Sequence, residues 1–381
     1  MRYLGGKTFG VILAAGLTAC SAGPQVPAKG TVFGQAVATT VDSEVARYHI
    51  EDYLRGRTSD PAMTARIDAV YRRYEGSVPS RDDLKAISTE LSVDFASLFL
   101  VDRLLSSGCN RQLNETFARY VDGTIAAVPD PSAYRVLFVP GWDYIENGRV
   151  TGADFAQPRK LATAFGLDNV LVELPPTGSV EENAQVIAAY IAKHAASGKR
   201  LLLAGASSAG PAIQLALGER LGRDESAAVT AWLNLGGILQ GSPLVDYLQR
   251  WPQRWLFNVV AWYKDWDRSA ILSMGTVPSR ERFQRLKLEP GILVVNYLGV
   301  PLSGQVGRFS RDKYPLLRTE GPNDGLTLAA DVIAPGSLTI VALGRDHFFA
   351  EDPQIDLKTL ALMKLMLQLV EQGTGSVCVA D

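Results

Sequence analysis

The pattern of apolar and polar positions changes near residue 134. Before residue 128, apolar residues recur at helical spacing with few glycines, and capping residues precede three of these runs, at Ser43, Asp60 and Ser80. After residue 134, short continuous apolar runs alternate with amphipathic stretches. The first pattern predicts a helical N-terminal extension over residues 42–128, and the second predicts an α/β domain over residues 134–373.

The α/β part contains six apolar runs that predict β-strands, and they cover residues 135–139, 169–174, 200–205, 229–235, 291–299 and 338–343. Amphipathic runs between them predict helices, for example over residues 181–196 and 211–221. Continuous apolar strands separated by helices are typical of a parallel sheet covered on both faces. We therefore expect a mostly parallel sheet with helices on both faces.

An insertion over about residues 243–289 separates the fourth and fifth predicted strands. It holds four of the six tryptophans, and at about 100° per residue these fall on one side of a helix. One interpretation is a helical cap that packs this aromatic stripe on the body of the domain. The other is a lid over an apolar pocket or a face in contact with lipid. The four residues are Trp251, Trp255, Trp262 and Trp266.

The N-terminal residues have the order of a targeting signal. Arg2 and Lys7 precede an apolar stretch over residues 9–19, which is too short to span a bilayer as a helix and ends in small residues before Cys20. Cysteine at this point makes residues 1–19 resemble a bacterial lipoprotein signal peptide, which implies lipidation of Cys20. An ordinary secretion signal with an unrelated cysteine is the alternative.

The lipoprotein resemblance implies a lipid-anchored protein of the bacterial cell envelope, at the outer membrane and facing the periplasm. Residues 20–41 are predicted to be a tether, because their first half is rich in Gly, Pro and Ala. Cys109 and Cys378 are then an even pair in an oxidising compartment. They either close a disulfide or remain separate thiols.

Composition narrows the functional classes. Hydrophobic residues make up 47% of the 381 residues and charged residues 20%, so a packed core is expected. The 38 basic and 40 acidic side chains give a net charge of −2, and no basic run with interleaved aromatics indicates nucleic-acid binding. The three histidines and three cysteines lack metal-ligand spacing. Neither a metal nor a cofactor is expected.

A serine pair follows the third predicted strand, in the sequence Gly205-Ala206-Ser207-Ser208-Ala209-Gly210. A nucleophilic serine on a sharp strand-to-helix turn needs small residues two positions away on either side. Both serines meet this requirement, and Ser207 is preferred because Gly205 then ends the strand. A serine-rich turn that only caps the next helix is the alternative.

A serine nucleophile needs a base and an orienting acid. Among the three histidines, only His347 follows a predicted strand directly, whereas His49 and His194 lie on predicted helices. The turn Asn323-Asp324-Gly325 supplies Asp324 as the acid, although this sequence also favours a turn with no catalytic role. Asp346 is a second and less suitable acid, because its side chain is next to His347 in sequence and would point away.

The developing oxyanion needs backbone N–H donors. The donors expected are the residue after the nucleophile, Ser208, and Trp142 in the turn that follows the first predicted strand. Together with these motifs, the chain resembles the α/β-hydrolase superfamily over residues 134–373, and within it bacterial lipases and esterases. Those lipases place their acid in a similar Asn-Asp-Gly turn.

The chain departs from the pattern of these lipases at two positions. Ala209 stands where the family usually has glycine, and no histidine precedes Gly141.

The resemblance implies an α/β-hydrolase fold and a serine hydrolase that cleaves carboxylic esters through an acyl-enzyme, with Ser207, His347 and Asp324 as the triad. Its partners would be a small-molecule or lipid ester and, through the anchor, the membrane. An acyltransferase with the same triad is one alternative, because water and alcohols attack the same acyl-enzyme. The other is a surface lipoprotein that keeps the fold as a binding scaffold.

Overall fold

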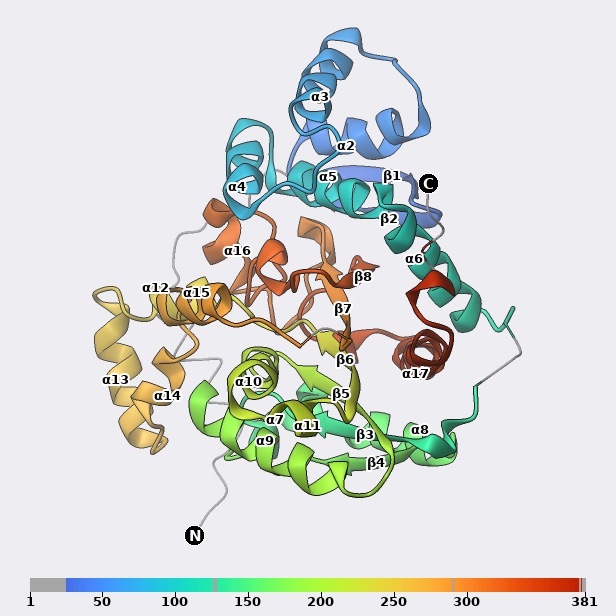
Figure 1. Ribbon diagram of the computed structural model, residues 1–381. Helices are drawn as coiled ribbons and strands as arrows, with labels where there is room; N and C mark the ends of the chain where they lie inside the picture. Colours follow the sequence, from blue (N-terminus) through green and yellow to red (C-terminus); the bar gives the residue numbers. More distant parts are fainter. Residues whose placement is uncertain (1–24, 126–128, 290, 377, 379–381) are drawn as a thin grey trace.

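The computed structural model describes residues 25–125, 129–289, 291–376 and 378 (Figure 1). Cys20 and residues 1–19, which carry the predicted anchor and signal, lie outside the described residues. Six parallel strands form the main sheet in the order β4-β3-β5-β6-β7-β8. Their bounds are β3 Tyr134–Val139, β4 Asp168–Leu171, β5 Arg200–Ala206, β6 Val229–Leu235, β7 Leu293–Val300 and β8 Leu338–Leu343.

Side chains of the main sheet alternate between two apolar layers, as the strand period of two requires. Leu137, Leu203 and Trp232 pack on one face, against the helices over residues 180–195 and 209–215. Phe138 and Leu202 pack on the other face, against the helices over residues 108–121, 156–164 and 355–372. The prediction of a parallel sheet covered on both faces is confirmed. The covering helices are α6 Gly108–Val121, α8 Ala156–Ala164, α9 Val180–Ala195, α10 Ala209–Leu215 and α17 Ile355–Gln372.

Residues 26–41 form an antiparallel hairpin of β1 (Val26–Val32) and β2 (Gln35–Val41), so the prediction of a tether there is wrong. The prediction relied on the Gly- and Pro-rich composition and overlooked that apolar residues alternate along both strands. Side chains on one face of the hairpin are buried in the same core as the helices over residues 44–51 and 93–106. These buried residues are Ala28, Val32, Val37 and Val41. Burial of one face therefore outweighs composition.

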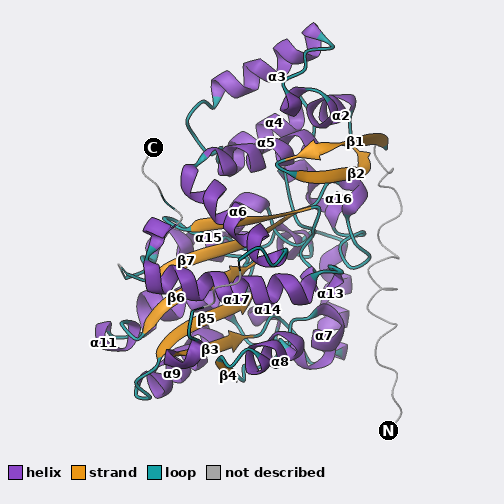
Figure 2. Ribbon diagram, turned by 90° about the vertical axis from the view of Figure 1, so that its right-hand side faces the viewer, coloured by secondary structure: helices purple, strands orange, loops and turns teal. Residues whose placement is uncertain are grey.

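The N-terminal helices lie beyond the β8 edge of the sheet, at the top of Figures 1 and 2. They are α2 Glu44–Glu51, α3 Pro61–Arg73, α4 Arg81–Glu90 and α5 Val93–Ser106, followed by α6. Ser43, Asp60 and Ser80 accept hydrogen bonds from the first turns of α2, α3 and α4, as N-caps do. Their apolar core includes residues of β7 and β8, so the extension and the sheet share one core.

Helix α6 covers the free edge of strand β8. The Asn114 side-chain amide donates to the Thr339 carbonyl oxygen at 2.9 Å and accepts from the Val341 N–H at 2.9 Å. Asn110, one helical turn earlier, accepts from the Thr339 N–H. These amides pair backbone groups that an open edge would expose. The same helix carries Cys109, which forms a disulfide with Cys378.

The insertion forms a cap of four helices, α12 Pro243–Tyr247, α13 Gln253–Tyr263, α14 Arg268–Leu272 and α15 Thr276–Arg285. The interpretation that the tryptophan stripe packs on the body is wrong for three of its four members. Helix α13 buries Phe257 and Ala261 instead. Trp251, Trp255 and Trp262 are exposed. The helix is apolar on nearly all sides, so the sequence could not show which side is inward.

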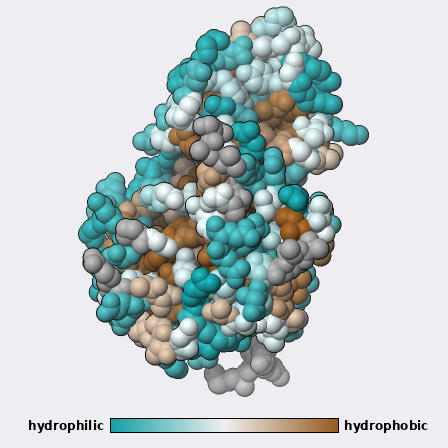
Figure 3. Space-filling view, turned by 45° about the vertical axis from the view of Figure 1, so that its right-hand side comes forward, coloured by the Kyte–Doolittle hydropathy of each residue, from teal (hydrophilic) through white to brown (hydrophobic). Residues whose placement is uncertain are grey.

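The remaining helices are α7 Tyr144–Thr151, α11 Arg223–Ser226 and α16 Tyr314–Leu317. The face of the molecule drawn in Figure 3 is mostly hydrophilic, with small hydrophobic patches between the polar areas. No helix in the described part of the chain has the length and apolar character needed to cross a membrane.

Candidate active site

The carboxyl ends of β3 and β5 mark the place where the chain reverses its direction of travel across the sheet. The connection after β3 leads outward to the edge strand β4, and the connection after β5 leads to β6 on the other side. Loops that leave neighbouring strands in opposite directions open a crevice, where ligands of open α/β sheets bind. The turn that contains Trp142 and the turn that contains Ser207 both lie at this point.

The turn after β5 resolves which serine has the special backbone. Ser207 has a φ of 55°, a left-handed conformation that is uncommon for a residue other than glycine. Ser208 has ordinary helical angles and is buried at the N-cap of α10. Strain at a strand-to-helix turn is a feature of the nucleophile elbow. The preference for Ser207 is therefore supported by its backbone.

Close packing holds the Ser207 turn in place. The Ser207 N–H donates to the Leu235 carbonyl oxygen of β6 at 3.1 Å, and the Ile238 N–H donates to the Ser207 carbonyl oxygen at 3.2 Å. At Gly205 an added Cβ would lie 2.2 Å from Ile213 Cδ1 of α10, so a larger residue would require the Ile213 side chain to move. The methyl group of Ala209, which departs from the family pattern, is accommodated in the core.

Two backbone N–H groups beside Ser207 have no hydrogen-bond partner within the described residues: those of Trp142 and Ser208. The turn after β3 lies against the Ser207 turn, because a Cβ added to Gly141 would be 3.6 Å from Ser207 Cβ. The next N–H, that of Asp143, is used by the Pro176 carbonyl oxygen at 2.7 Å. These two free N–H donors, from the turn after β3 and from the residue after Ser207, are those expected for an oxyanion hole.

The predicted base and acid are in contact. His347 Nδ1 lies 2.7 Å from Asp324 Oδ2, and both side chains are buried. The other oxygen of Asp324 accepts the N–H groups of Leu326 and Thr327 at 2.9 and 2.8 Å. A carboxylate can only accept, so this contact places the ring proton on Nδ1 and leaves Nε2 as the acceptor.

The backbone also fixes His347 relative to Asp324, since the His347 N–H donates to the Asp324 carbonyl oxygen at 3.0 Å. Asp346, the less suitable acid, accepts instead from the N–H groups of Gly307 and Phe348. Its side chain therefore serves the loop backbone rather than the histidine.

His347 lies next to the strand end that holds the Ser207 turn. A Cβ added to Gly236, the residue after β6, would be 3.6 Å from His347 Nδ1 and Cε1. Gly236 directly follows Leu235, which accepts the Ser207 N–H. No hydrogen bond joins the Ser207 hydroxyl to His347 in the described part of the chain, and His347 Nε2 has no protein partner there. Catalytic hydrogen bonds are often long before substrate binds.

Neither of the other histidines belongs to this edge. His49 is fully buried beside Tyr71, and burial lowers the pKa of its imidazole to about 3. His194 Nδ1 lies 2.9 Å from Arg135 Nη1 at the amino end of the sheet, and burial together with Arg135 lowers its pKa. Both histidines have structural partners.

The sequence analysis missed the role of the glycine pair after β6. An added Cβ on Gly237 would lie 2.0 Å from Asn234 Oδ1, and one on Gly236 would lie 3.2 Å from Phe349 Cε2 and in ordinary contact with His347. Larger side chains at Gly236 and Gly237 would therefore fill the space between the end of β6 and His347. Two consecutive glycines at the carboxyl end of a predicted strand were the available signal. Asp143, which follows Trp142 in the turn after β3, is buried, and burial raises the pKa of its carboxyl group.

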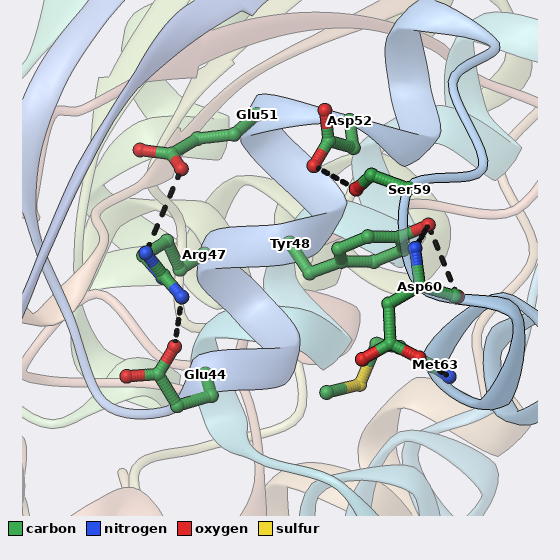
Figure 4. A pocket seen from close by; sticks show the side chains of 8 residues that line it. All are labelled: Glu44, Arg47, Tyr48, Glu51, Asp52, Ser59, Asp60 and Met63. Carbon is green, nitrogen blue, oxygen red and sulfur yellow. Dashed lines mark hydrogen bonds and ion pairs between the residues drawn. The ribbon is translucent and has the colours of Figure 1, made fainter.

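Two cavities lie in the described part of the chain, one in the N-terminal extension and the other beside the carboxyl end of β8. One of about 400 Å³ is lined by charged side chains of the N-terminal extension (Figure 4). Its charges are already paired, since Arg47 contacts Glu44 and Glu51, and Asp52 accepts from Ser59. The second, of about 370 Å³, includes Arg345 and Lys358. Among the described residues, no group of three or more His, Cys, Asp or Glu is placed to hold a metal ion.

Comparison with solved structures identifies the fold. A carboxyl esterase of metagenomic origin superposes with a TM-score of 0.55 at 18% identity, over 70% of this chain and 92% of that chain. A Bacillus licheniformis lipase in its propeptide form gives 0.50 at 20% identity, over 66% and 52%. The chain has an α/β-hydrolase fold. The mature form of that lipase gives 0.48 at 20% identity, over 62% and 92%.

No protein-family model and no curated protein sequence matches the chain. At these levels of identity, the structural likeness shows the α/β-hydrolase fold alone. The chemistry of this α/β-hydrolase therefore has to be argued from its own residues.

Proposed function

We propose that the protein is a serine hydrolase that cleaves carboxylic esters. The observation that carries the proposal is the left-handed Ser207 turn with two unpaired N–H donors beside it, at the strand edge that also holds the buried Asp324–His347 pair. The solved structures with the same fold include a carboxyl esterase and a lipase, which supports an ester as the substrate class.

In the proposed reaction, the Ser207 hydroxyl attacks the ester carbonyl carbon while His347 Nε2 takes its proton. Asp324 holds the ring proton on Nδ1 and stabilises the imidazolium that forms. The N–H groups of Trp142 and Ser208 donate to the oxyanion of the tetrahedral intermediate. The protonated imidazole then gives its proton to the leaving alcohol, and an acyl-enzyme remains. Water, activated by the same imidazole, releases the acid.

The hydroxyl of Ser207 needs this assistance because an unassisted serine is a weak nucleophile at neutral pH. The two N–H donors are fixed by backbone packing and need no reorganisation during the reaction. Removing one such donor typically costs about 10²–10³ in turnover in other hydrolases. The proposal thus assigns most of the rate acceleration to the Ser207 turn and the Gly141-Trp142 turn.

We also propose that Cys20 carries a lipid and anchors the enzyme in the bacterial cell envelope. The support is the order of charged, apolar and small residues before Cys20. The disulfide between Cys109 and Cys378 fits an oxidising compartment. Mass spectrometry of the mature N-terminal peptide tests the lipid directly: Cys20→Ser should lack the modification, and an unmodified Cys20 in the parent protein from the membrane fraction would contradict a lipid on this residue.

A fluorophosphonate probe tests the proposed chemistry without knowledge of the ester. We expect one adduct on the peptide that contains Ser207 and loss of labelling after heat denaturation. Ser207→Ala should abolish labelling, and Ser208→Ala should retain it because the backbone N–H is kept. Labelling of Ser208 would move the nucleophile. No labelling of a folded protein would favour a non-catalytic scaffold.

A further inference from the structure

The cap presents an aromatic face to solvent. Trp255, Val259, Trp262 and Tyr263 stand at positions i, i+4, i+7 and i+8 of α13, which is one side of the helix. Trp251 lies two residues before the start of the helix. The exposed fractions of the four aromatic side chains are 86% (Trp251), 68% (Trp255), 82% (Trp262) and 73% (Tyr263). We call these five residues the cap face.

The C-terminal end of α13, which carries the cap face, lies beside the mouth of the crevice. Trp266, just after α13, packs edge-on against Trp142 with ring centroids 6.3 Å apart. Lys264 pairs with Glu146 of α7 at 3.1 Å, beside the exposed Ile145. A surface that contacts the cap face would therefore lie against the entrance between the β3 and β5 turns.

The proposed lipid anchor leads to the same side of the molecule. A Cβ added to Gly304, in the segment after the carboxyl end of β7, would lie 2.5 Å from Thr39 Oγ1, which places the end of β2 there. Val26, the first residue of β1, pairs with Val41 at that end of β2. In Figure 2, β1 begins on the side to which the arrowheads of β3 and β5 point, which is also the side of α13 and α7.

Because residues 26–41 are folded as a hairpin, the linker between Cys20 and the folded body is short. Since β1 begins at Val26, only residues 20–25 separate the proposed lipidated cysteine from the folded body. At about 3.3–3.6 Å per residue, six steps span at most about 20 Å. A linker this short, attached near the carboxyl ends of the strands, would turn this side of the protein toward the membrane. This step rests on the lipidation proposed above.

The charges beside the cap face favour an anionic surface. Arg250, Arg254 and Arg268 are exposed and have no ion-pair partner within the described residues, and they outnumber the two exposed carboxylates of the turn after α13, Asp265 and Asp267. They flank an aromatic face on a chain whose net charge is −2. Tryptophan and tyrosine prefer the lipid–water boundary, where the ring is buried and the polar atom stays hydrated. A second copy of the chain would bring like-charged arginines together in a two-fold interface.

We propose that the cap face docks on an anionic phospholipid surface. Its aromatic side chains enter the headgroup region and its arginines pair with lipid phosphates. With Cys20 lipidated, the protein is held at two points and the crevice faces the membrane. Esters of amphiphilic molecules in that membrane would then be the accessible substrates if the hydrolase activity is as proposed. Docking itself does not depend on that activity.

The test is sedimentation with vesicles of phosphatidylcholine, with and without phosphatidylglycerol. The protein used is the chain from Ser21, which lacks the anchor cysteine and keeps every described residue. We expect binding to the anionic vesicles. Trp255→Ala with Trp262→Ala should weaken it by about tenfold for each tryptophan. Arg250→Gln with Arg254→Gln should weaken it by about fivefold for each arginine and remove the preference for anionic lipid.

Two matched controls accompany these variants. Leu357→Ala removes an exposed apolar side chain from α17, outside the cap, and should bind like the parent. Ser207→Ala should also bind normally, which separates docking from catalysis. Equal binding by the double tryptophan variant, or no binding by the folded parent, would overturn the proposal. A parent dimer that the tryptophan variant converts to a monomer would assign the face to a second copy instead.

Discussion

Replacing Asp324 with Asn tests the proposed acid with little change in shape. Asp324 Oδ1 accepts from the N–H groups of Leu326 and Thr327, and Oδ2 contacts His347 Nδ1 at 2.7 Å. The amide of Asn will keep its oxygen on the two N–H donors. Its NH₂ group then faces His347 Nδ1 and donates to it, so the ring proton moves to Nε2. A protonated Nε2 cannot take the proton of Ser207.

The reverse amide orientation would restore the useful tautomer, and the structure gives its cost. It places NH₂ against two buried N–H donors and leaves both unsatisfied, at about 1–3 kcal/mol each. At 1.4 kcal/mol per factor of ten, a total of about 2–6 kcal/mol leaves roughly one molecule in 10–10⁴ in the productive orientation. Loss of the negative charge beside the imidazolium adds to this. We expect the reaction at Ser207 to slow by about 10³–10⁴.

The assay is the second-order rate of fluorophosphonate labelling, with circular dichroism and thermal unfolding as checks of the fold. Asp346→Asn is the matched control, because this carboxylate is also buried and adjacent to His347 but accepts from Gly307 and Phe348 N–H groups. It should lower stability while the labelling rate stays within severalfold of the parent. A folded Asp324→Asn protein that labels within tenfold of the parent would refute the assignment, and slow labelling only in Asp346→Asn would transfer the role.

Three further predictions concern stability. Cys109→Ser with Cys378→Ser opens a loop of 269 residues, and we expect the free energy of unfolding, measured in urea, to fall by about 2–5 kcal/mol. Asn114→Ala leaves backbone groups of the β8 edge unpaired, and the same measurement should show a loss of about 1–3 kcal/mol. Burial, and then Asp42, raise the pKa of Asp94 to about 7, so the folded state holds its proton more tightly than the unfolded chain. This contribution to stability is full below pH 3.8, the ordinary pKa of an aspartate in an unfolded chain, and is lost as pH rises to about 7. Asp94→Asn should therefore flatten that part of the profile of unfolding free energy against pH, and an unchanged slope would contradict the assignment.

The sequence by itself determined the sheet and the spacing of the candidate chemistry. Strands buried on both faces must be apolar throughout, so β6 and β8 begin and end where their apolar runs do. Of the three histidines, only His347 directly follows a predicted strand, so the sequence offered one candidate for a base at a strand end. Its acid was predicted from the Asn-Asp-Gly turn, and the structure brings Asp324 and His347 into contact.

Tertiary structure decided the features that depend on partners distant in sequence. The neighbouring serines share small flanking residues, and only the packing of β5 against β6 and α10 puts Ser207, not Ser208, at positive φ. Residues 26–41 have the composition of a tether, yet they pair because an apolar core is present to bury one face.

The cap helix shows the same limit most clearly. Helix α13 carries apolar residues on nearly every side, and periodicity identifies a face only where polar residues define the opposite one. Phe257 and Ala261 pack inward, whereas Trp255 and Trp262 are left outside. Burial of a helix face depends on the shape of the surface it meets, and that surface is assembled from strands and loops far away in the chain.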